Sequence, residues 1–478
     1  MRHSRRQFLL SAGALGTAAG LGIAQPWRRA AAAVARPPLN PLPGSAVDGH
    51  LVWNLEAVGY VSDEYLLSGT ADVYESVSMA DAVDMSKRNG AADFNNRNFN
   101  RTVVQAEVPY VTRIIVYRPR SAARFSGNVV SEVLHVGGGG MPAAFQTAQP
   151  SFIANGDVLM GVQHPASFEG VRAADPARYG SMSAVHPTQL WGMVRDAGRL
   201  VKEGGFAGLH SYRVRRQFLT GRSFTGVAAA TFANFHHQHA RLGNGAAAFD
   251  GYLPITSGYY VRPLDVPVIR INTLSEFALY GLGNRADDSD TVGSRLRLYE
   301  VAGACHYFPS AKLLAEAPKP RQPPARVAGT PQNDRAACLA GFGAGARQND
   351  LPAHIFVAGA FDNLYRWSRD GIAPPRATRF VTTADGKPML DASGNVLGGV
   401  RSPYVDLPLV TYGAGEGTCR NDGYARPLSV ETLRAIHHSR SDYQARVAGL
   451  SAELVKQRWI RPEARQLLLD DALRAVDF

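Results

Sequence analysis

Short apolar runs rich in β-branched and aromatic residues recur along the chain, and each stops at glycine or another turn residue. Such runs are typical of buried strands. Stretches with helical periodicity lie between them, of which residues 186–205 are an example. One side of this predicted helix carries Leu190, Met193, Val194, Ala197 and Val201. The alternation predicts an α/β fold in which helices cover both faces of a mostly parallel sheet, after a strand-rich segment at residues 50–118.

Four groups of chemically useful residues follow predicted strands. They are the glycine run 137–140, Ser223, Glu276 and His306. Functional residues of a parallel sheet gather beyond the carboxyl ends of its strands, and these ends lie at one edge of the sheet. We therefore expect the four groups to meet in space.

Ser223 lies in "GRSFTG", between an apolar run and a segment of small residues that opens a predicted helix. A strand-to-helix turn of the form G-x-S-x-G presents its serine as a nucleophile. Here the second glycine comes one residue later, and Thr225 is small enough for the crowded position. The alternative is that Ser223 only caps the helix N-terminus. The other strand-end candidates favour the nucleophile.

A nucleophilic serine needs a base within hydrogen-bond reach and an acid that orients the base. Ser223, Glu276 and His306 follow the chain order serine, acid, histidine that is typical of the α/β-hydrolase fold. We prefer Glu276 as the acid because it directly follows an apolar strand. We interpret "NRADDSDT" as a solvated loop. The rival acids are Asp250, Asp265, Asp287, Asp288 and Asp290.

The developing oxyanion needs two backbone N–H donors. Phe224, directly after the serine, is the first candidate, and the run "HVGGGG" offers Gly137 and Gly138 as the second. Glycines there allow close approach of the backbone to a substrate. A phosphate loop is excluded because neither G-K-[ST] nor the context of G-x-G-x-x-G is present.

A histidine cluster, His236, His237 and His239, has helical spacing but no nearby Cys, Asp or Glu that completes a metal site. We interpret it as a polar helix end near the mouth of the site, with metal binding as the alternative. We predict that the protein uses no metal and no organic cofactor.

The first 35 residues have the features of an export signal. The segment Ser4-Arg5-Arg6-Gln7-Phe8-Leu9-Leu10 has the twin-arginine pattern, an apolar run continues to Ala24, and Ala33-Val34-Ala35 is an A-x-A cleavage site. The apolar run is too short and glycine-rich for a good membrane span. We expect the twin-arginine export machinery as a partner, cleavage near Ala35, a periplasmic or secreted protein, and no stable membrane anchor afterwards.

Charge and cysteine content restrict the function further. The net charge of +11 falls to +6 without residues 1–35, which hold five arginines and no acids. No basic cluster with interleaved aromatic residues occurs, so we expect no nucleic-acid partner. The three cysteines, Cys305, Cys338 and Cys419, form no C-x-x-C pair. In an oxidising compartment we favour a Cys338–Cys419 disulfide, because Cys305 adjoins His306.

Stretches through most of the chain after the signal, among them "GYVSDEYLLSGTADVYE", "ARYGSM", "GRSFTG", "YEVAGACHYF" and "RWSRDGIAPP", resemble a family of exported bacterial alpha/beta hydrolase domain proteins. The resemblance implies serine esterase chemistry. It places the family's acid at Glu276, where relatives often carry Asp, and the histidine of its E-V-A-G-x-x-H segment at His306. Cys338 and Cys419 also fall at cysteine positions of the family.

Two positions depart from the family pattern. The family elbow is similar to G-x-S-Q-S-G, whereas this chain has Phe224 and Thr225 after the serine. The early strand of relatives commonly ends in Leu-Asn, and here it ends in Leu134-His135. We assign His135, together with Tyr179 of "ARYGSM", to substrate binding.

We therefore predict an exported serine hydrolase, a carboxylic ester hydrolase that acts on a small-molecule ester through Ser223, His306 and Glu276. The alternatives are an acyltransferase, lactonase or amidase with the same residues, or a non-catalytic binding protein that keeps the scaffold. We expect the C-terminal part to restrict access to the site. The predicted domains are a signal at 1–35, an extended lead-in at 36–50, an alpha/beta-hydrolase core with insertions at 51–375, and a cap packed on that core at 376–478.

Overall fold

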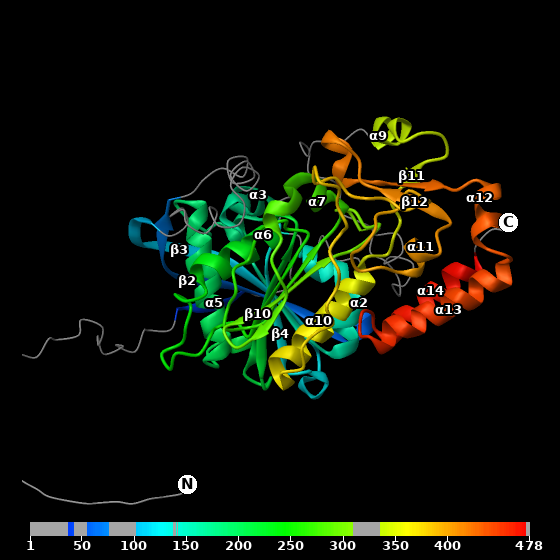
Figure 1. Ribbon diagram of the computed structural model, residues 1–478. Coiled ribbons are helices and arrows are strands. Elements are labelled where there is room, and N and C mark those ends of the chain that lie inside the picture. The colour runs from blue at the N-terminus through cyan, green and yellow to red at the C-terminus, as the bar shows by residue number, and fades with distance from the viewer. Residues whose placement is uncertain are drawn as a thin grey trace, which may run out of the picture. The chain divides into compact units, whose positions relative to one another are not determined.

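A ten-stranded sheet runs through the described part of the chain in the computed structural model (Figure 1). Its strand order is β1-β2-β3-β5-β4-β6-β7-β8-β10-β9. The six strands β5, β4, β6, β7, β8 and β10 are parallel, whereas β1, β2, β3 and β9 pair in antiparallel fashion. The strands span Leu39–Leu42, Tyr60–Tyr74, Val103–Pro119, Asn128–Val133, Val158–Val162, Arg216–Arg222, Gly251–Ile255, Val268–Asn272, Ser289–Thr291 and Ser294–Glu300, from β1 to β10.

The structure describes residues 37–42, 55–75, 102–136, 140, 142–308 and 335–474. All of them belong to the unit Arg36–Phe478. The predicted export signal lies outside the described residues. Gly137 and Gly138 lie outside them too, so their assignment to the oxyanion hole stays a prediction.

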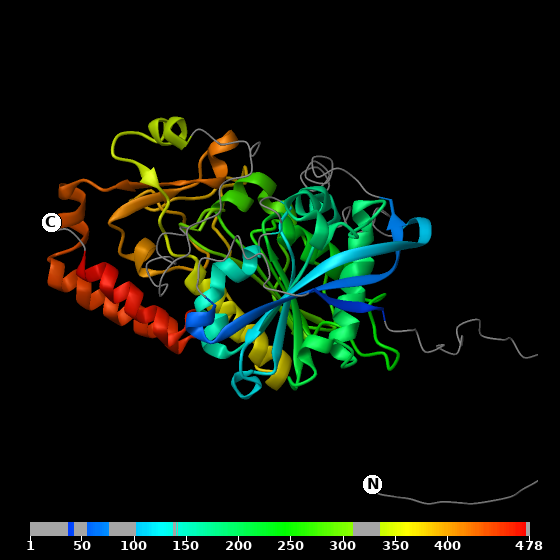
Figure 2. The same ribbon diagram turned by 180° about the vertical axis from the view of Figure 1, so that it is seen from behind.

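Helices cover both faces of the sheet, as the sequence predicts (Figures 1 and 2). Successive strand residues point to opposite faces, so in β6 Phe218 packs into one apolar layer and Leu219 into the other. Helices α2 and α10 cover the Phe218 layer, and α5 and α6 cover the Leu219 layer. Their bounds are Ala143–Asn155, His354–Asp370, Leu190–Lys202 and Phe224–Thr231. The predicted fold class is therefore confirmed.

Helix α5 confirms the periodicity of residues 186–205, because all five of its predicted apolar positions are buried. It begins later than the pattern suggests, at Leu190. The preceding Pro187–Gln189 form a 3-10 turn, η5, closed by a capping box between His186 and Gln189.

The chain order of β4 and β5 decides where the site forms. The chain leaves β3, passes to β4 in the interior of the sheet, and then returns to β5 beside β3. Strand β4 therefore pairs with both β5 and β6, and Glu132 at its end lies opposite Thr220. The segments that follow β4, β5 and β6 consequently meet at one edge of the sheet.

Residues after α10 add a second small sheet and a pair of helices. Strands β11 (Arg347–Gln348), β13 (Tyr424–Pro427) and β12 (Val410–Gly413) pair in that order. Tyr412 and Ala425 belong to the same apolar cluster as α2 and α10, so this part shares a continuous core with the large sheet. Helices α13 and α14 follow (Figure 2). They span Arg440–Lys456 and Pro462–Leu473. Whether residues 376–478 act as a cap stays a prediction.

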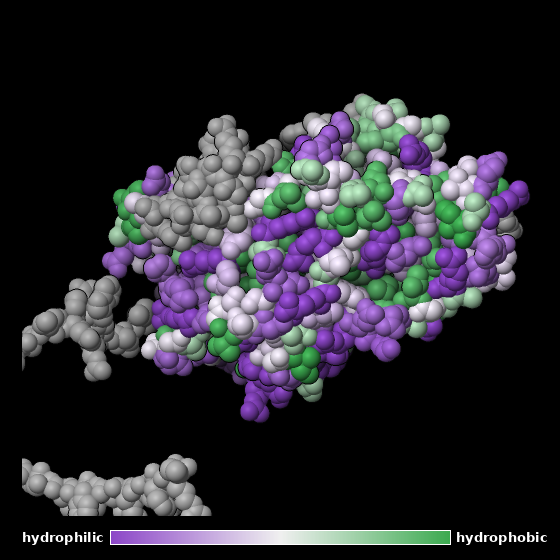
Figure 3. Space-filling view, viewed as in Figure 1, coloured by the Kyte–Doolittle hydropathy of each residue, from purple (hydrophilic) through white to green (hydrophobic). Residues whose placement is uncertain are grey.

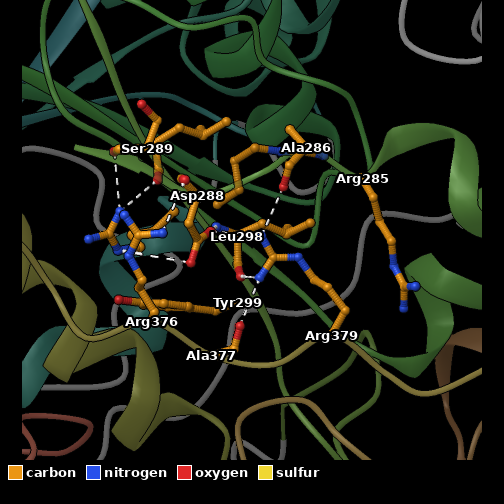
Figure 4. A network of polar contacts seen from close by, with 12 residues as sticks. Arg285, Ala286, Asp288, Ser289, Leu298, Tyr299, Arg376, Ala377 and Arg379 are labelled. Atoms are coloured by element: carbon orange, nitrogen blue, oxygen red, sulfur yellow. Dashed lines mark hydrogen bonds and ion pairs between the residues drawn. The ribbon is translucent and has the colours of Figure 1, made fainter. Parts of the chain in front are cut away.

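A polar network fastens the segment after α10 to the edge of the sheet (Figure 4). The Asp288 carboxylate accepts hydrogen bonds from the Arg379 guanidinium at 2.7 Å and from the Leu298 N–H at 3.1 Å. Arg376 and Arg297 both pair with Asp290. The prediction of a solvated loop is thus wrong for Asp288, whose side chain is only 7% exposed beside Arg379. Asp290 stays 40% exposed, although it pairs with both Arg297 and Arg376. Asp287 is exposed, as predicted.

Figure 3 shows hydrophilic residues over most of one face, with apolar residues in scattered patches. Across residues 37–42, 55–75, 102–136, 140, 142–308 and 335–474, no helix combines the length and the apolar character needed to cross a membrane.

Candidate active site

Ser223 occupies a sharp turn between β6 and α6. Its φ of 60° and ψ of −127° are rare for a residue with a side chain, and they are sustained only where the surroundings enforce them. The two glycines of the motif leave the necessary room. A Cβ atom on Gly221 would lie 2.1 Å from the carbonyl oxygen of Thr225, and one on Gly226 would lie 2.6 Å from that of Ile255.

Thr225 holds the same turn from inside. Its hydroxyl accepts a hydrogen bond from the Arg222 N–H at 2.9 Å and donates one to the Arg222 carbonyl at 3.0 Å. Ser223 stands at the N-cap position of α6, but its side chain makes no capping hydrogen bond. The capping alternative therefore does not account for this serine, whose hydroxyl is turned to His306 instead.

All four polar atoms of His306 are hydrogen-bonded. Nε2 lies 2.7 Å from the Ser223 Oγ, and Nδ1 lies 2.6 Å from the Glu276 Oε1. The backbone N–H donates to the Ser275 Oγ at 3.0 Å, and the carbonyl accepts from the Arg222 Nη2 at 2.7 Å. With Glu276 ionised, Nδ1 carries the proton, and Nε2 is then free to accept the hydrogen of the serine hydroxyl.

Glu276 is fixed at the N-terminus of α7 (Leu274–Tyr280) by a capping box with Thr273. Its Oε2 accepts from the Thr273 N–H at 2.8 Å and from the Thr273 hydroxyl at 2.6 Å. Burial acts to raise the pKa of this carboxyl group, but the hydrogen bonds from His306 and Thr273 outweigh burial and hold the pKa below its usual value. Glu276 is therefore charged at neutral pH and orients the imidazole.

Arg222 and Ser275 are contacts of His306 that the sequence analysis missed. The Arg222 guanidinium lies 4.7 Å from the centre of the Phe308 ring, and burial lowers its pKa to about 10. Ser275 is buried directly before Glu276 in α7. Neither contact has a sequence signal, because each depends on where His306 lies in space.

Phe224, the predicted first oxyanion donor, is the first residue of α6. The N–H groups of a first helical turn have no partner within the helix, so such a group is free to bind a negative charge. The Phe224 side chain lies edge-on to two imidazoles, with ring centres 6.1 Å from His135 and 5.3 Å from His164. His135 thus lies beside the serine turn, and its assignment to substrate binding stays a prediction.

His164 follows β5, and the strand-end rule that identified the other candidates would have found it too. Its Nδ1 accepts a hydrogen bond from the Ala166 N–H at 3.0 Å, which leaves the proton of the neutral ring on Nε2. Burial lowers the pKa of His164 to about 4. Burial and the nearby Arg222 and His306 also lower the pKa of His135. Both rings are therefore uncharged at neutral pH.

Tyr179 is placed in a buried ion-pair network. Its hydroxyl lies 2.9 Å from both carboxylate oxygens of Glu64, which also pairs with Arg113 and Arg178. Arg113 continues the network to Gln163 at 3.0 Å. These contacts give Tyr179 a structural environment, and its assignment to substrate binding stays a prediction.

The histidine cluster is buried in the Leu219 layer, apart from His239. His237 lies 2.8 Å from the Tyr252 hydroxyl and 2.7 Å from the Asp265 carboxylate, and His236 stacks on Trp191. The interpretation of His236 and His237 as a polar helix end at the site mouth is therefore wrong. Within the described ranges, no group of three or more His, Cys, Asp or Glu side chains has the arrangement of a metal site.

The rival acids are engaged elsewhere. Asp250 pairs with Lys202 and accepts from the Gln217 N–H at 2.7 Å. Asp265 pairs with Arg241 as well as His237. Among the described residues, Glu276 is thus the carboxylate that contacts the His306 ring.

The structure joins Cys338 and Cys419 in a disulfide, the pairing that the sequence analysis favours. Cys305 keeps a free thiol, buried beside the Gly413 carbonyl at 3.3 Å. Burial raises the pKa of this thiol to about 12, so it stays protonated.

Residues 30–470 match the family described as "Alpha/beta hydrolase domain". The chain belongs to this family. No curated protein matches it.

Among solved structures, this chain is similar to native esterase 2 of Thermogutta terrifontis, with 15% identity and a TM-score of 0.29. The native form is matched over 43% of this chain and 84% of that chain. This chain is also similar to a methylesterase, with 12% identity and a TM-score of 0.28. The match covers 59% of this chain and 56% of the methylesterase. TM-scores this low carry no argument, so the assignment to the family rests on the sequence match.

The crowding at Gly221 predicts the effect of a single methyl group. Gly221→Ala should lower the free energy of unfolding by about 1–3 kcal/mol, because its Cβ collides with backbone that has no room to move. Gly170→Ala in α3 (Phe168–Ala174) is the matched control, since nothing lies within 4 Å of its added Cβ. The free energy of unfolding of that variant should rise by up to about 1 kcal/mol, because alanine favours a helix more than glycine does. Urea unfolding of both variants checks this, and equal stabilities would contradict it.

Glu132 predicts a pH dependence of stability. It is buried at the end of β4, where its two carboxyl oxygens accept hydrogen bonds from the N–H groups of Ala144 and Phe145 in α2. Burial raises its pKa from 4.5 to about 8. The folded protein thus keeps a proton that the unfolded chain releases above pH 4.5. This contribution to stability is complete below pH 4.5 and is lost as the pH rises towards 8.

We therefore expect Glu132→Gln to flatten the decline in unfolding free energy between pH 5 and pH 8, which amounts to at most about 1.4 kcal/mol per pH unit in the wild type. Glu169→Gln, at an exposed position in the first turn of α3, is the control and should follow the wild type. Urea unfolding at three pH values measures the slopes. If the unfolding free energies of the wild type and of Glu132→Gln changed with pH in parallel, the pH dependence would not come from Glu132.

Proposed function

We propose that this protein is a serine hydrolase that cleaves carboxylic esters through Ser223, His306 and Glu276. One observation carries the proposal: the imidazole of His306 lies within hydrogen-bond distance of the Ser223 hydroxyl on one side and of the Glu276 carboxylate on the other. Such a relay of hydroxyl, imidazole and carboxylate activates a serine for acyl transfer. Membership of the alpha/beta hydrolase domain family supports the same reaction class.

The geometry suggests a role for each residue in the first half-reaction. His306 Nε2 takes the hydroxyl proton while Ser223 Oγ attacks the ester carbonyl. Glu276, ionised and held by Thr273, stabilises the imidazolium that forms. The Phe224 N–H, together with Gly137 and Gly138, stabilises the oxyanion. The tetrahedral intermediate then expels the alcohol, which receives its proton from His306.

The second half-reaction repeats the steps with water. His306 removes a proton from a water molecule, whose oxygen attacks the acyl-enzyme carbonyl. Collapse of the second tetrahedral intermediate releases the carboxylic acid and returns the proton to Ser223. None of these steps requires a metal or an organic cofactor.

The neutral imidazoles argue against a cationic ester as substrate. His135 and His164 carry no charge at neutral pH and pack on Phe224, which adjoins the nucleophile. A cationic group placed against these rings would lose its hydration without gaining a counter-charge from them, and the nearby Arg222 would repel it.

Export is a separate part of the proposal, supported by the twin-arginine pattern and the A-x-A site of residues 1–35. We expect the protein in the periplasm or the medium to begin near Arg36. N-terminal sequencing of the exported protein measures this directly, and an uncleaved N-terminus outside the cytoplasm would refute it.

A fluorophosphonate probe tests the proposed nucleophile. The wild type should be labelled and Ser223→Ala should not, while hydrolysis of a short-chain aryl ester falls by roughly 10³-fold to 10⁶-fold. Ser441→Ala, at an exposed position on α13, is the matched control and should keep both activities. Thermal melting of each variant confirms that it is folded.

Three results would contradict this proposal. They are labelling that persists in Ser223→Ala, hydrolysis that is unaffected in this variant, and absence of labelling in the folded wild type. The last would favour a binding protein on the hydrolase scaffold. With labelling established, a panel of esters, lactones and amides, with and without an acyl acceptor, separates ester hydrolysis from the other reactions of the same residues.

A further inference from the structure

The backbone of His306 is tied to a segment more than 100 residues further along the chain. The buried hydroxyl of Ser275 accepts a hydrogen bond from the His306 N–H at 3.0 Å and donates one to the Arg420 carbonyl at 2.7 Å. Ser275 is 1% exposed, so water does not compete for either bond. One hydroxyl thus links the histidine that activates the proposed nucleophile to the segment around Arg420.

A second hydrogen bond joins the same two segments. The N–H of Tyr307 donates to the Asn421 carbonyl at 3.1 Å. Two consecutive residues of the histidine loop are therefore held by two consecutive residues of the other segment. Helix α7, which carries Ser275 and Glu276, also packs against this segment.

Arg420 and Asn421 belong to η9, a short 3-10 helix at Gly417–Asn421. It lies in the connection between β12 and β13, outside both strands of the pair. Cys419, at the centre of η9, is joined by the disulfide to Cys338 in α9 (Arg335–Gly341). Figure 1 shows α9 beside the small sheet. The disulfide is thus a covalent anchor at the residue directly before the two carbonyl groups.

We infer that the Cys338–Cys419 disulfide, acting through η9 and Ser275, positions His306, so that reduction of this disulfide slows the reaction proposed above. The inference rests on the proposed function. Ser275 is a positioning residue, since it contacts the histidine backbone rather than the reacting atoms. With the disulfide open, Glu276 and Ser223 still contact the ring, but the loop that carries the ring loses its fixed support.

The redox step balances with a dithiol as reductant. The dithiol supplies two electrons and two protons, the Cys338–Cys419 bond breaks to give two thiols, and the dithiol closes to its own disulfide. Cys305 does not confuse the result. It is already reduced, it is buried beside Gly413 and Asn349, and its raised pKa keeps it from reacting.

The prediction concerns kcat rather than KM, because the disulfide supports the base and not the substrate. A dithiol should lower the kcat of the wild type by roughly threefold to tenfold with KM unchanged, as expected when a catalytic group loses its orientation. The Cys338→Ser/Cys419→Ser variant should have the lower kcat from the start and show no response to dithiol. Mass spectrometry verifies that the wild-type disulfide is reduced.

Ser275→Ala tests the route through η9. Removing the hydroxyl should itself lower kcat, and reduction should then have a smaller effect than in the wild type, since part of the link is already broken. Effects of distant, independent changes would multiply instead. Full multiplication of the two effects, or an unchanged kcat in the fully reduced wild type, would overturn the inference.

Hydrogen exchange gives a readout that does not depend on activity. Reduction should speed the exchange of the His306 and Tyr307 amides in folded wild-type protein, and unchanged exchange would overturn the inference even if the cysteine variant failed to fold. The Ser223→Ala experiment fails or succeeds separately. Loss of the proposed function would appear as labelling independent of Ser223, whereas failure of the present inference would appear as a redox-insensitive enzyme that still requires Ser223.

Discussion

The site depends on one constraint: every polar atom of His306 has a hydrogen-bond partner. A side chain with two ring nitrogens and a free backbone has many accessible orientations. Here its four polar atoms have partners from two parts of the fold: Arg222 and Ser223 at the end of β6, and Ser275 and Glu276 at the start of α7. Because these elements belong to the sheet and its covering helices, the orientation of one imidazole is set by the packing of the whole domain.

The charge distribution around this imidazole is asymmetric. Glu276 is an anion at neutral pH, Arg222 is a cation bound to the His306 carbonyl, and His135 and His164, which pack on Phe224, are neutral. In the proposed reaction, the positive charge that develops on His306 faces the Glu276 carboxylate of α7. In the proposed reaction, the neutral rings in contact with Phe224 place no anion beside the predicted oxyanion donor.

The sequence predicted the elements of the site that follow from strand order. Ser223 directly follows β6, whereas Glu276 and His306 lie a few residues beyond the ends of β8 and β10, so the strand order brings all three to one edge of the sheet. The same rule applied to His164 but was not used for it. Arg222 and Ser275 were beyond prediction, because their partner is the backbone of His306 and nothing in local sequence marks such a contact. The roles of Asp288 and His237 were misjudged for a related reason: polar local sequence indicated solvent, while distant partners bury these side chains.

Gly221 and Gly226 were readable as turn residues, but the sequence left open whether Ser223 was a cap or a nucleophile. The structure speaks against the cap, because the Ser223 side chain makes no capping hydrogen bond and its hydroxyl lies 2.7 Å from the His306 Nε2. Such a distinction depends on backbone geometry, which the pattern of residue types does not contain.

Residues 420 and 421 support the His306 loop through their backbone carbonyl groups, which every amino acid carries. Most exchanges of side chain there keep the hydrogen bonds to Ser275 and Tyr307. The side chains at these two positions can therefore change while the backbone hydrogen bonds that support the His306 loop are kept. An inventory of side chains at positions 420 and 421 would therefore miss these two contacts with the His306 loop.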